Sequence, residues 1–378
     1  MFLIDRYIAW TFTKVVLVAL VSLAGLYVVV DAMNNLEELL TYAKSQPGGA
    51  LRVLVDYYGP RVLVLFDRTA GLLATVAAML TITLLQRSQE LTALMAAGVS
   101  KVRIAAPVLA SAVVVTALGV ANREWMLPQV RERLAYNAQD LSGQYGRAVT
   151  PRYDNHTLFM FSGAKAYPKL RCFDAPQIRL SAEFSSWGQK IQADKGYFLP
   201  ADEKHPAGYL LQGVSTPTDL TELPLAMLEK APVLIGPKDA AWLKPNECFV
   251  ASGLSFEQLT GDTTFRHYFS TLELVRGLGN KSLDFGNDAK VIVHVRLLTP
   301  LLDFTVLLLG LPLVLGRENR KIYVAVGVCA VLVAALLAVT MASHAAGTNF
   351  LLRPSLAAWL PLMIFAPAAY ALARPLWD

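Results

Sequence analysis

Residues 86–103 read QRSQELTALMAAGVSKVR and lie between two long apolar runs, at about 62–85 and 104–121. If both runs cross a membrane, a connector between them needs only a few polar turn residues. This stretch instead has the pattern of a short helix, because its apolar residues recur at helical spacing and form one stripe. The members of this stripe are Leu91, Leu94, Met95, Gly98 and Val102.

Capping residues and charges in the same stretch also favour a helix. Ser88 is suited to be the N-cap, and Glu90 follows in the first turn, where the helix dipole favours an acid. Gly98 suits the C-terminal stop, and Ser100 can cap the helix that follows. A second stripe is small in the middle and charged at its ends: Glu90, Ala93, Ala97 and Lys101. The pattern alone leaves two interpretations open, a helix that rests on lipid and a helix that docks a partner.

The composition indicates a membrane protein. Of 378 residues, 54% are hydrophobic and 17% are charged, whereas soluble domains are roughly a quarter charged. The net charge of +5 is modest and is typical of basic cytoplasmic loops rather than of a nucleic-acid surface. The three cysteines form no CxxC, which argues against a zinc site. Pairing of Cys172 with Cys248 in an oxidising compartment and two free thiols both remain open.

Six stretches are apolar over the roughly 20 residues that a membrane-spanning helix needs. We interpret the first as a retained anchor, because it is too long for a signal peptide and VVVDAMNN after it has no small-x-small cleavage site. By the positive-inside rule, basic loops such as GRENRK (316–321) place both termini in the cytoplasm. The six stretches lie at about 10–30, 62–85, 104–121, 291–315, 322–344 and 355–372.

The insertion between the third and fourth stretches has a different pattern and lies outside in this topology. Aromatic and β-branched residues alternate with polar ones in HTLFMF (156–161) and QKIQADKGYFL (189–199), and turn clusters separate such runs. This pattern predicts a sandwich or jelly roll. The predicted fold is therefore membrane α-helical, with six transmembrane helices arranged three plus three and an inserted all-β jelly-roll-like domain. The predicted domains are residues 1–121, 122–289 and 290–378.

Signatures of an enzyme are missing, so we expect no catalytic residue, no metal site and no bound cofactor in this chain. The segment nearest to a P-loop, GLGNKS (277–282), has Asn280 where the motif requires glycine. HExxH and GxSxG are also absent from the sequence. A chain of this kind that performs work must take its energy from another chain.

Ionisable residues in or beside the apolar stretches are costly in a membrane and are therefore candidates for binding. Arg68, His294 and Arg296 lie near the outer ends of their stretches. They either snorkel to the headgroups or form an entrance for an anionic amphiphile. Asp303 lies deeper, which favours a place against a cavity or a partner helix.

The segment SQELTALMAAGVSKVRI (88–104) resembles the segment after the second span of the LptF/LptG permeases, also called the YjgP/YjgQ family. Further similar stretches follow in the order of that family, and together they cover essentially the whole chain. They are YYGPRVLVLF (57–66), NREWMLPQV (122–130), CFVASGLSFEQLT (248–260), STLELVRGL (270–278) and HVRLLTPLLDFTVLLLGLPLVLGREN (294–319).

This resemblance implies a permease subunit of the ABC-type exporter that takes lipopolysaccharide, or a related anionic glycolipid, from the inner membrane of Gram-negative bacteria. In that family two LptF/LptG-like subunits pair around a cavity. An LptB-like ATPase dimer drives them from the cytoplasm, and an LptC/LptA-like periplasmic bridge receives the lipid. Both termini are then cytoplasmic and the β domain periplasmic, with no role for nucleic acid.

Carried over by position, the resemblance makes residues 86–100 a coupling helix for the ATPase, with the contacts Glu90, Leu91, Ala93, Leu94, Ala97 and Gly98. Arg317, Arg320 and Lys321 are additional candidates for that interface. The candidate lipid-headgroup contacts are Lys44, Arg61, Arg68, His294 and Arg296. Inward-facing residues of the jelly roll either line the path of the acyl chains or form a packed core: Phe159, Phe161, Ile178, Leu180, Ile191 and Phe198.

One departure from the family leaves the lipid open. Members with studied lipid contacts carry basic residues after the first span, where this chain has Asp31, Glu37 and Glu38. Two alternatives also stand beside the exporter. A mechanotransmitting ABC permease usually has its outer domain after the first span, and a membrane-anchored protein with an outer β domain for binding or catalysis requires a site that 122–289 does not display.

Overall fold

The computed structural model describes residues 2–45, 48–134, 146–167, 170–202, 205–228, 231–260, 267–279, 282, 286–315 and 322–377. The chain divides into two compact units. The helical unit comprises Met1–Leu134, Tyr268–Thr271 and Gly286–Asp378. The β unit comprises Ala135–His267 and Leu272–Phe285.

Six described helices of the helical unit are long and apolar enough to cross a membrane, which confirms the predicted three-plus-three arrangement. Short helices and a π-helical turn, η1, connect or extend them. The six are α1 (Phe2–Asn34), α3 (Gly49–Arg87), α5 (Lys101–Ala121), α9 (Gly286–Leu315), α10 (Ile322–Thr348) and α11 (Pro354–Trp377). The shorter elements are α2 (Leu36–Ser45), α4 (Glu90–Ala96), η1 (Asn122–Met126) and α6 (Leu127–Leu134).

Helix α3 is the centre of the helical unit. In its most apolar window 61% of the residues are buried, against 33% or less in the other five spans. Its buried face is rich in alanine, which lets neighbouring helices approach closely. Buried Thr81 and Thr83 donate their hydroxyls to carbonyls of the preceding turn, at 2.7 Å each, so no polar group of theirs is left unsatisfied in lipid.

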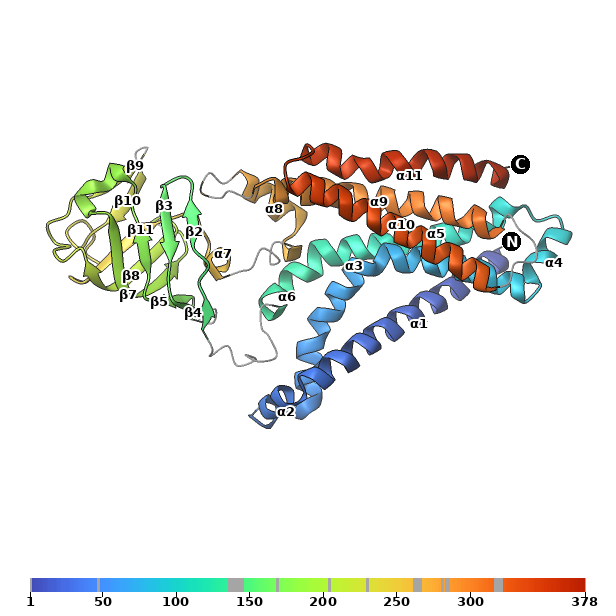
Figure 1. The fold of residues 1–378 in the computed structure, drawn as a ribbon. Helices are drawn as coiled ribbons and strands as arrows, with labels where there is room; N and C mark the ends of the chain where they lie inside the picture. Colours follow the sequence, from blue (N-terminus) through green and yellow to red (C-terminus); the bar gives the residue numbers. More distant parts are fainter. Residues whose placement is uncertain are drawn as a thin grey trace. The chain divides into compact units, whose positions relative to one another are not determined.

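Figure 1 shows α1 and α3 joined through α2 at one end of the helical unit, with α4 at the opposite end. Both termini of the chain lie at the end that carries α4. This follows from the even number of spans, because the start of α1 and the end of α11 then lie on the same side. The side of the membrane that α4 faces therefore also holds both termini.

The described residues of the β unit form an eleven-stranded antiparallel sheet, confirming the predicted inserted β domain. The strand order is β1-β4-β5-β7-β8-β11-β10-β9, and β2, β3 and β6 branch from β7. The strands are β1 (Arg147–Ala148), β2 (Arg152–Asp154), β3 (Phe159–Ser162), β4 (Lys165–Tyr167), β5 (Cys172–Asp174), β6 (Gln177–Arg179), β7 (Lys190–Leu199), β8 (Gly208–Thr216), β9 (Ala226–Leu228), β10 (Ala231–Ile235) and β11 (Glu247–Ala251). The helical elements are η3 (Ala182–Trp187), α7 (Phe256–Thr260) and α8 (Thr271–Leu278).

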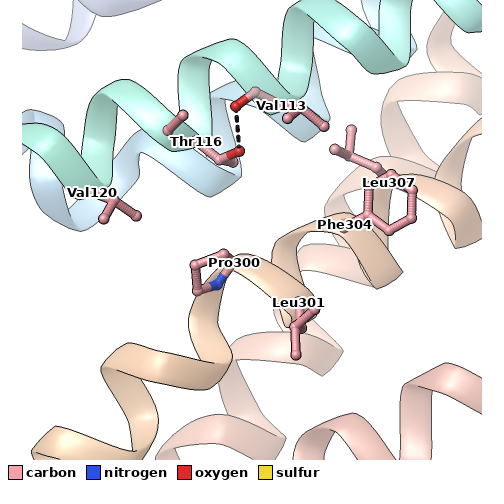
Figure 2. Close-up of a pocket in the computed structure, with 8 residues that line it drawn as sticks. Val113, Thr116, Val120, Pro300, Leu301, Phe304 and Leu307 are labelled. Atoms are coloured by element: carbon pink, nitrogen blue, oxygen red, sulfur yellow. Dashed lines mark hydrogen bonds between the residues drawn. The ribbon is translucent and has the colours of Figure 1, made fainter.

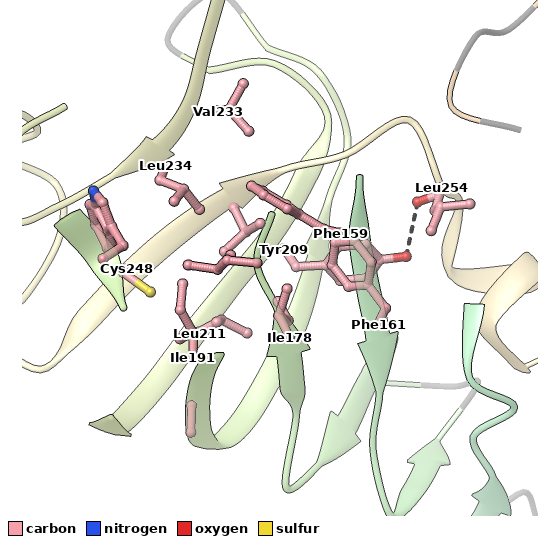
Figure 3. Close-up of a cluster of buried hydrophobic side chains, with 14 of the residues drawn as sticks. Phe159, Phe161, Ile178, Ile191, Tyr209, Leu211, Val233, Leu234, Cys248 and Leu254 are labelled. Atoms are coloured by element: carbon pink, nitrogen blue, oxygen red, sulfur yellow. Dashed lines mark hydrogen bonds between the residues drawn. The ribbon is translucent and has the colours of Figure 1, made fainter. Parts of the chain in front are cut away.

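Alternation along the strands builds the core of the β unit. In β3, Phe159 and Phe161 are buried while Met160 between them is exposed, as the period of two requires. Two large polar aromatics in the core have partners for their polar atoms. Tyr209 donates its hydroxyl to the carbonyl of Leu254 at 2.9 Å (Figure 3), and Trp187 donates its indole N–H to the carbonyl of Pro224 at 2.9 Å.

Candidate functional site

Helix α4 forms as predicted within residues 86–103, but its first cap differs from the prediction. Gln89 occupies the N-cap position with a φ of 63°. Ser88 instead ends α3, because its hydroxyl donates to the carbonyl of Leu84 at 3.0 Å. At the other end Gly98 has a φ of 83°, and the N–H of Val99 donates to the carbonyl of Leu94 at 3.0 Å, a bond typical of a glycine-terminated helix.

The two sides of α4 have different surroundings. Leu91 is 3% exposed and belongs to the same core cluster as Ile8 and Phe12 of α1, with Leu94 and Met95 packed against it. Ala93, Ala97 and Gly98 are exposed, and Glu90 is half-buried at the start of the helix. The predicted coupling residues are thus divided between an anchored apolar side and an open side of small residues.

Polar contacts attach the loop that carries α4 to the spans around it. The hydroxyl of Tyr7 donates to Oε1 of Glu90 at 3.2 Å, and Arg103 lies 2.9 Å from Asp5. Gln86 donates its amide to the carbonyl of Val314 on α9 at 2.8 Å. Arg317, Arg320 and Lys321 lie outside the described residues.

The predicted lipid-headgroup contacts differ in their surroundings, and their role stays a prediction. Lys44 and Arg68 are exposed, and His294 is half-buried. The guanidinium of Arg61 stacks at 3.5 Å on the ring of Tyr57. Arg296 is half-buried and donates to the carbonyl of Phe269 at 2.6 Å.

Two consecutive polar residues of η1, which follows α5 directly, bind α3, and neither was predicted from the sequence as a candidate site residue. Asn122 donates its amide to the carbonyl of Leu63 on α3 at 2.9 Å. Nε of Arg123 lies 2.7 Å from Asp67, and the two side chains are only 14% and 15% exposed. A charged residue directly after an apolar run is the only sequence signal of this site, and such residues usually snorkel.

An apolar groove of about 420 Å³ lies between α5 and α9. Figure 2 shows Val113, Thr116 and Val120 on α5 opposite the α9 residues. The hydroxyl of Thr116 donates to the carbonyl of Val113 at 3.0 Å and so leaves the groove without a free polar group. The α9 side consists of Pro300, Leu301, Phe304 and Leu307.

Comparison with known families decides what this arrangement belongs to. Residues 6–151 and 191–375 match the family described as the lipopolysaccharide export system permease LptF/LptG. The chain belongs to the LptF/LptG family. It is therefore a lipopolysaccharide export permease of the inner membrane, a transporter rather than an enzyme, which sets aside the mechanotransmitting and anchored-enzyme alternatives. None of the curated proteins compared matches the chain.

In this LptF/LptG permease, the predicted acyl-path residues lie together in the core of the β unit. Phe161, Ile178 and Ile191 are neighbours in register across β3, β6 and β7. Phe159 and Leu180 are also buried, and Phe198 is partly buried against the same cluster. A packed core, the second of the two interpretations of these residues, accounts for this packing. Their role in an acyl path stays a prediction.

The two cysteines of the permease's β unit are both free and buried. Burial raises the pKa of the Cys248 thiol to about 12. Burial and the nearby Asp174 also raise the pKa of Cys172. Both thiols are therefore protonated at neutral pH, and the alternative of two free cysteines holds.

Proposed function

We propose that this permease is driven by a separate LptB-like ATPase dimer that docks on α4 from the cytoplasm. The observation that carries this proposal is the two-sided environment of α4. A helix buried on one side through Leu91 and open on the other through Ala93 and Ala97 can receive force from a partner and pass it to the spans. The chain itself has no P-loop motif, so the nucleotide site belongs to that partner.

The exposed side of α4 suits a close-fitting partner. Alanine and glycine side chains let another surface approach the helix backbone, and the half-buried carboxylate of Glu90 offers a charged contact at its edge. This assignment makes the end of the helical unit that carries α4 and both termini cytoplasmic, which agrees with the basic loops of the sequence. The β unit is then periplasmic.

A second LptF/LptG-like subunit is proposed to cover α1. Only 6% of the residues in the most apolar window of α1 are buried, so most of that window is available to lipid or to a partner, although Ile8 and Phe12 near the start of the helix belong to the core. Large apolar side chains line its exposed length, namely Leu17, Val18, Val21, Leu26, Val29 and Val30. Two such helices facing each other would enclose the cavity that receives the lipid.

The exported lipid is proposed to be lipopolysaccharide or a related anionic glycolipid. Lys44 in the last turn of α2 and Arg68 midway along α3 are exposed cations that suit its phosphates. The acyl chains would then pass to the β unit, where the core around Phe161 and Ile178 would have to open. An LptC/LptA-like periplasmic bridge is the proposed acceptor.

Affinity purification of the full chain in mild detergent tests this function. We expect a P-loop ATPase and a second six-span subunit to copurify with the natural sequence. Ala93→Trp, on the open side of α4, should lose the ATPase but retain the second subunit. Val114→Trp, an exposed position within α5, is the matched control and should retain both.

Two results would contradict the proposal at different points. Absence of any ATPase from the natural complex would overturn the driven-permease mechanism. Normal ATPase binding by Ala93→Trp would be compatible with a permease driven by an ATPase, but it would show that the open side of α4 is not the docking surface. We avoid Gly98 for this test, because its φ of 83° makes any side chain there disrupt the helix end itself.

A further inference from the structure

The chain returns from the β unit through a short segment that belongs to the helical unit. Residues Tyr268–Thr271 group with the spans, although Ala135–His267 before them and Leu272–Phe285 after them belong to the β unit. We call Tyr268–Thr271 the return segment. Charged side chains from three elements of the helical unit hold it.

Glu124 of η1 binds the last residue of the return segment with both carboxylate oxygens. Its Oε2 accepts the backbone N–H of Thr271 at 2.9 Å, and its Oε1 accepts the hydroxyl of Thr271 at 2.5 Å. Thr271 is also the first residue of α8, so its N–H has no acceptor within that helix. A carboxylate that accepts two hydrogen bonds from one residue fixes both its position and its orientation.

Two arginines hold Phe269 in the middle of the return segment. Arg296 of α9 donates to the Phe269 carbonyl at 2.6 Å. The guanidinium of Arg131 on α6 lies 5.0 Å from the centre of the Phe269 ring, within the range of a cation–π contact. The return segment is therefore bound at its backbone and at its side chain.

The residue that binds Thr271 is itself held in place. Glu124 follows Asn122 and Arg123, and both of these bind α3, through the carbonyl of Leu63 and the carboxylate of Asp67. Consecutive residues of one π-helical turn thus join α3 to the return segment. Such turns commonly occur at functional sites, because the extra residue redirects side chains that a regular helix would point elsewhere.

We propose that Glu124 and Arg296 are positioning residues of the transport cycle. They connect α3, α5 and α9 to the return segment, so that a displacement of these spans is passed to the chain that continues into α8 and the β unit. The proposal rests on the proposed function, in which an ATPase moves the spans and the β unit receives the lipid. It adds the mechanical connection between those two events.

The test uses the full complex of permease, partner subunit and ATPase in proteoliposomes with lipopolysaccharide. The variants are Glu124→Ala, which removes the acceptor, and Thr271→Val, which keeps the shape of threonine and removes only the hydroxyl. Thr271→Ser keeps the hydroxyl and serves as the conservative rescue. Glu183→Ala removes an exposed carboxylate of the β unit and is the matched control.

Three quantities are measured for each complex. Hydrogen–deuterium exchange measures the protection of the Thr271 amide, and the rate of ATP hydrolysis measures the activity of the ATPase. Photocrosslinking of lipopolysaccharide to the periplasmic bridge measures delivery of the lipid. For Glu124→Ala we expect amide exchange to rise about tenfold, as one lost hydrogen bond to a charged group implies. We expect delivery to fall about fivefold while the ATPase rate is unchanged. Thr271→Val should reduce delivery in the same direction, and Thr271→Ser and Glu183→Ala should behave as the natural sequence.

The outcomes separate this inference from the function on which it rests. Unchanged amide protection in Glu124→Ala would show that the contact does not hold the return segment. Faster exchange with full delivery in both Glu124→Ala and Thr271→Val would overturn the positioning role. A natural complex that hydrolyses ATP without any delivery would instead overturn the proposed function, because that result does not depend on the variants.

Discussion

The carboxylate of Asp303 on α9 fills the space beside Gly71 on α3 that a Cβ atom at position 71 would occupy. A glycine in the most buried span therefore makes room for an acidic side chain in the neighbouring span. Asp303 was predicted to face a cavity or a partner helix. Within this chain its carboxylate packs on α3, and a contact with a second subunit stays a prediction.

We expect Gly71→Ala to destabilise the helical unit by about 1–3 kcal/mol, the usual cost of overpacking. The added methyl group overlaps the carboxylate of Asp303, so that this side chain or the helix that carries it has to shift. Thermal unfolding in detergent measures the effect, and Gly71→Ala combined with Asp303→Ala should recover most of the loss. Gly25→Ala is the control, because no heavy atom lies within 4 Å of its added Cβ. Equal unfolding temperatures for Gly71→Ala and the natural sequence would contradict the contact.

The ion pair between Arg123 and Asp67 should contribute far more than the one between Arg103 and Asp5. The first pair is 14% and 15% exposed, and the second is 45% and 32% exposed. Arg123→Met leaves a carboxylate in a largely buried place, so we expect a loss of about 3 kcal/mol. Arg103→Met should cost less than about 1 kcal/mol.

The double variant Asp67→Leu with Arg123→Met checks the cause of that loss. Removing both charges leaves no unpaired buried carboxylate, so stability should return toward that of the natural sequence. Denaturation of the purified subunit in detergent measures all three variants. If the double variant is no more stable than Arg123→Met alone, the loss does not come from the unpaired charge.

Two positions on α5, two residues apart, should differ in how well they tolerate a larger side chain. A Cβ on Gly119 would lie 2.8 Å from the Cβ of Ala70, a rigid atom of a buried residue, so Gly119→Ala should be destabilising. Ala117 lines the groove of about 420 Å³, so Ala117→Phe should change the free energy of unfolding by less than about 0.5 kcal/mol. If Ala117→Phe is destabilised while Gly119→Ala unfolds at the normal temperature, the assignment of an open groove to Ala117 and a tight contact to Gly119 is wrong.

The buried thiols make the β unit less stable at high pH. A group whose pKa is raised on folding supports the folded state below its unfolded pKa and loses that support as pH rises through the folded pKa. For Cys248 this window runs from the ordinary 9.0 to about 12, because burial disfavours the thiolate. We expect stability to fall across this range, and Cys248→Ser should show a different pH profile from the natural sequence.

Alkylation kinetics provide a direct measure of the same burial. Because burial raises the pKa of Cys248, the folded protein holds far less Cys248 thiolate than the unfolded chain at a pH below 9.0. Labelling of a Cys329→Ala variant with iodoacetamide should therefore be slow for Cys248 until denaturant is added. Rapid labelling of Cys248 in the folded protein would contradict its buried place.

Much of the architecture could be predicted from local pattern. Apolar runs long enough to cross a bilayer predict the spans, and alternation such as that around Phe159 and Phe161 predicts the inserted sheet. The stripe through Leu91 and Leu94 predicts α4 between two spans. These features depend on residues close together in the chain, where helical and strand periodicity act directly. A local prediction that was wrong is Ser88 as the cap of α4, because its hydroxyl bonds backward to α3.

The contacts between residues far apart in the sequence were decided only by tertiary structure. Glu124 and Thr271 are 147 residues apart in the sequence, and nothing local to either of them specifies the other. The same is true of Asp303 and Gly71, where an acidic residue is tolerated because a distant position lacks a side chain. Periodicity determines which face of an element is apolar. Which charged group meets which partner depends on how whole helices pack, because a buried charge is stable only where the completed fold supplies its partner.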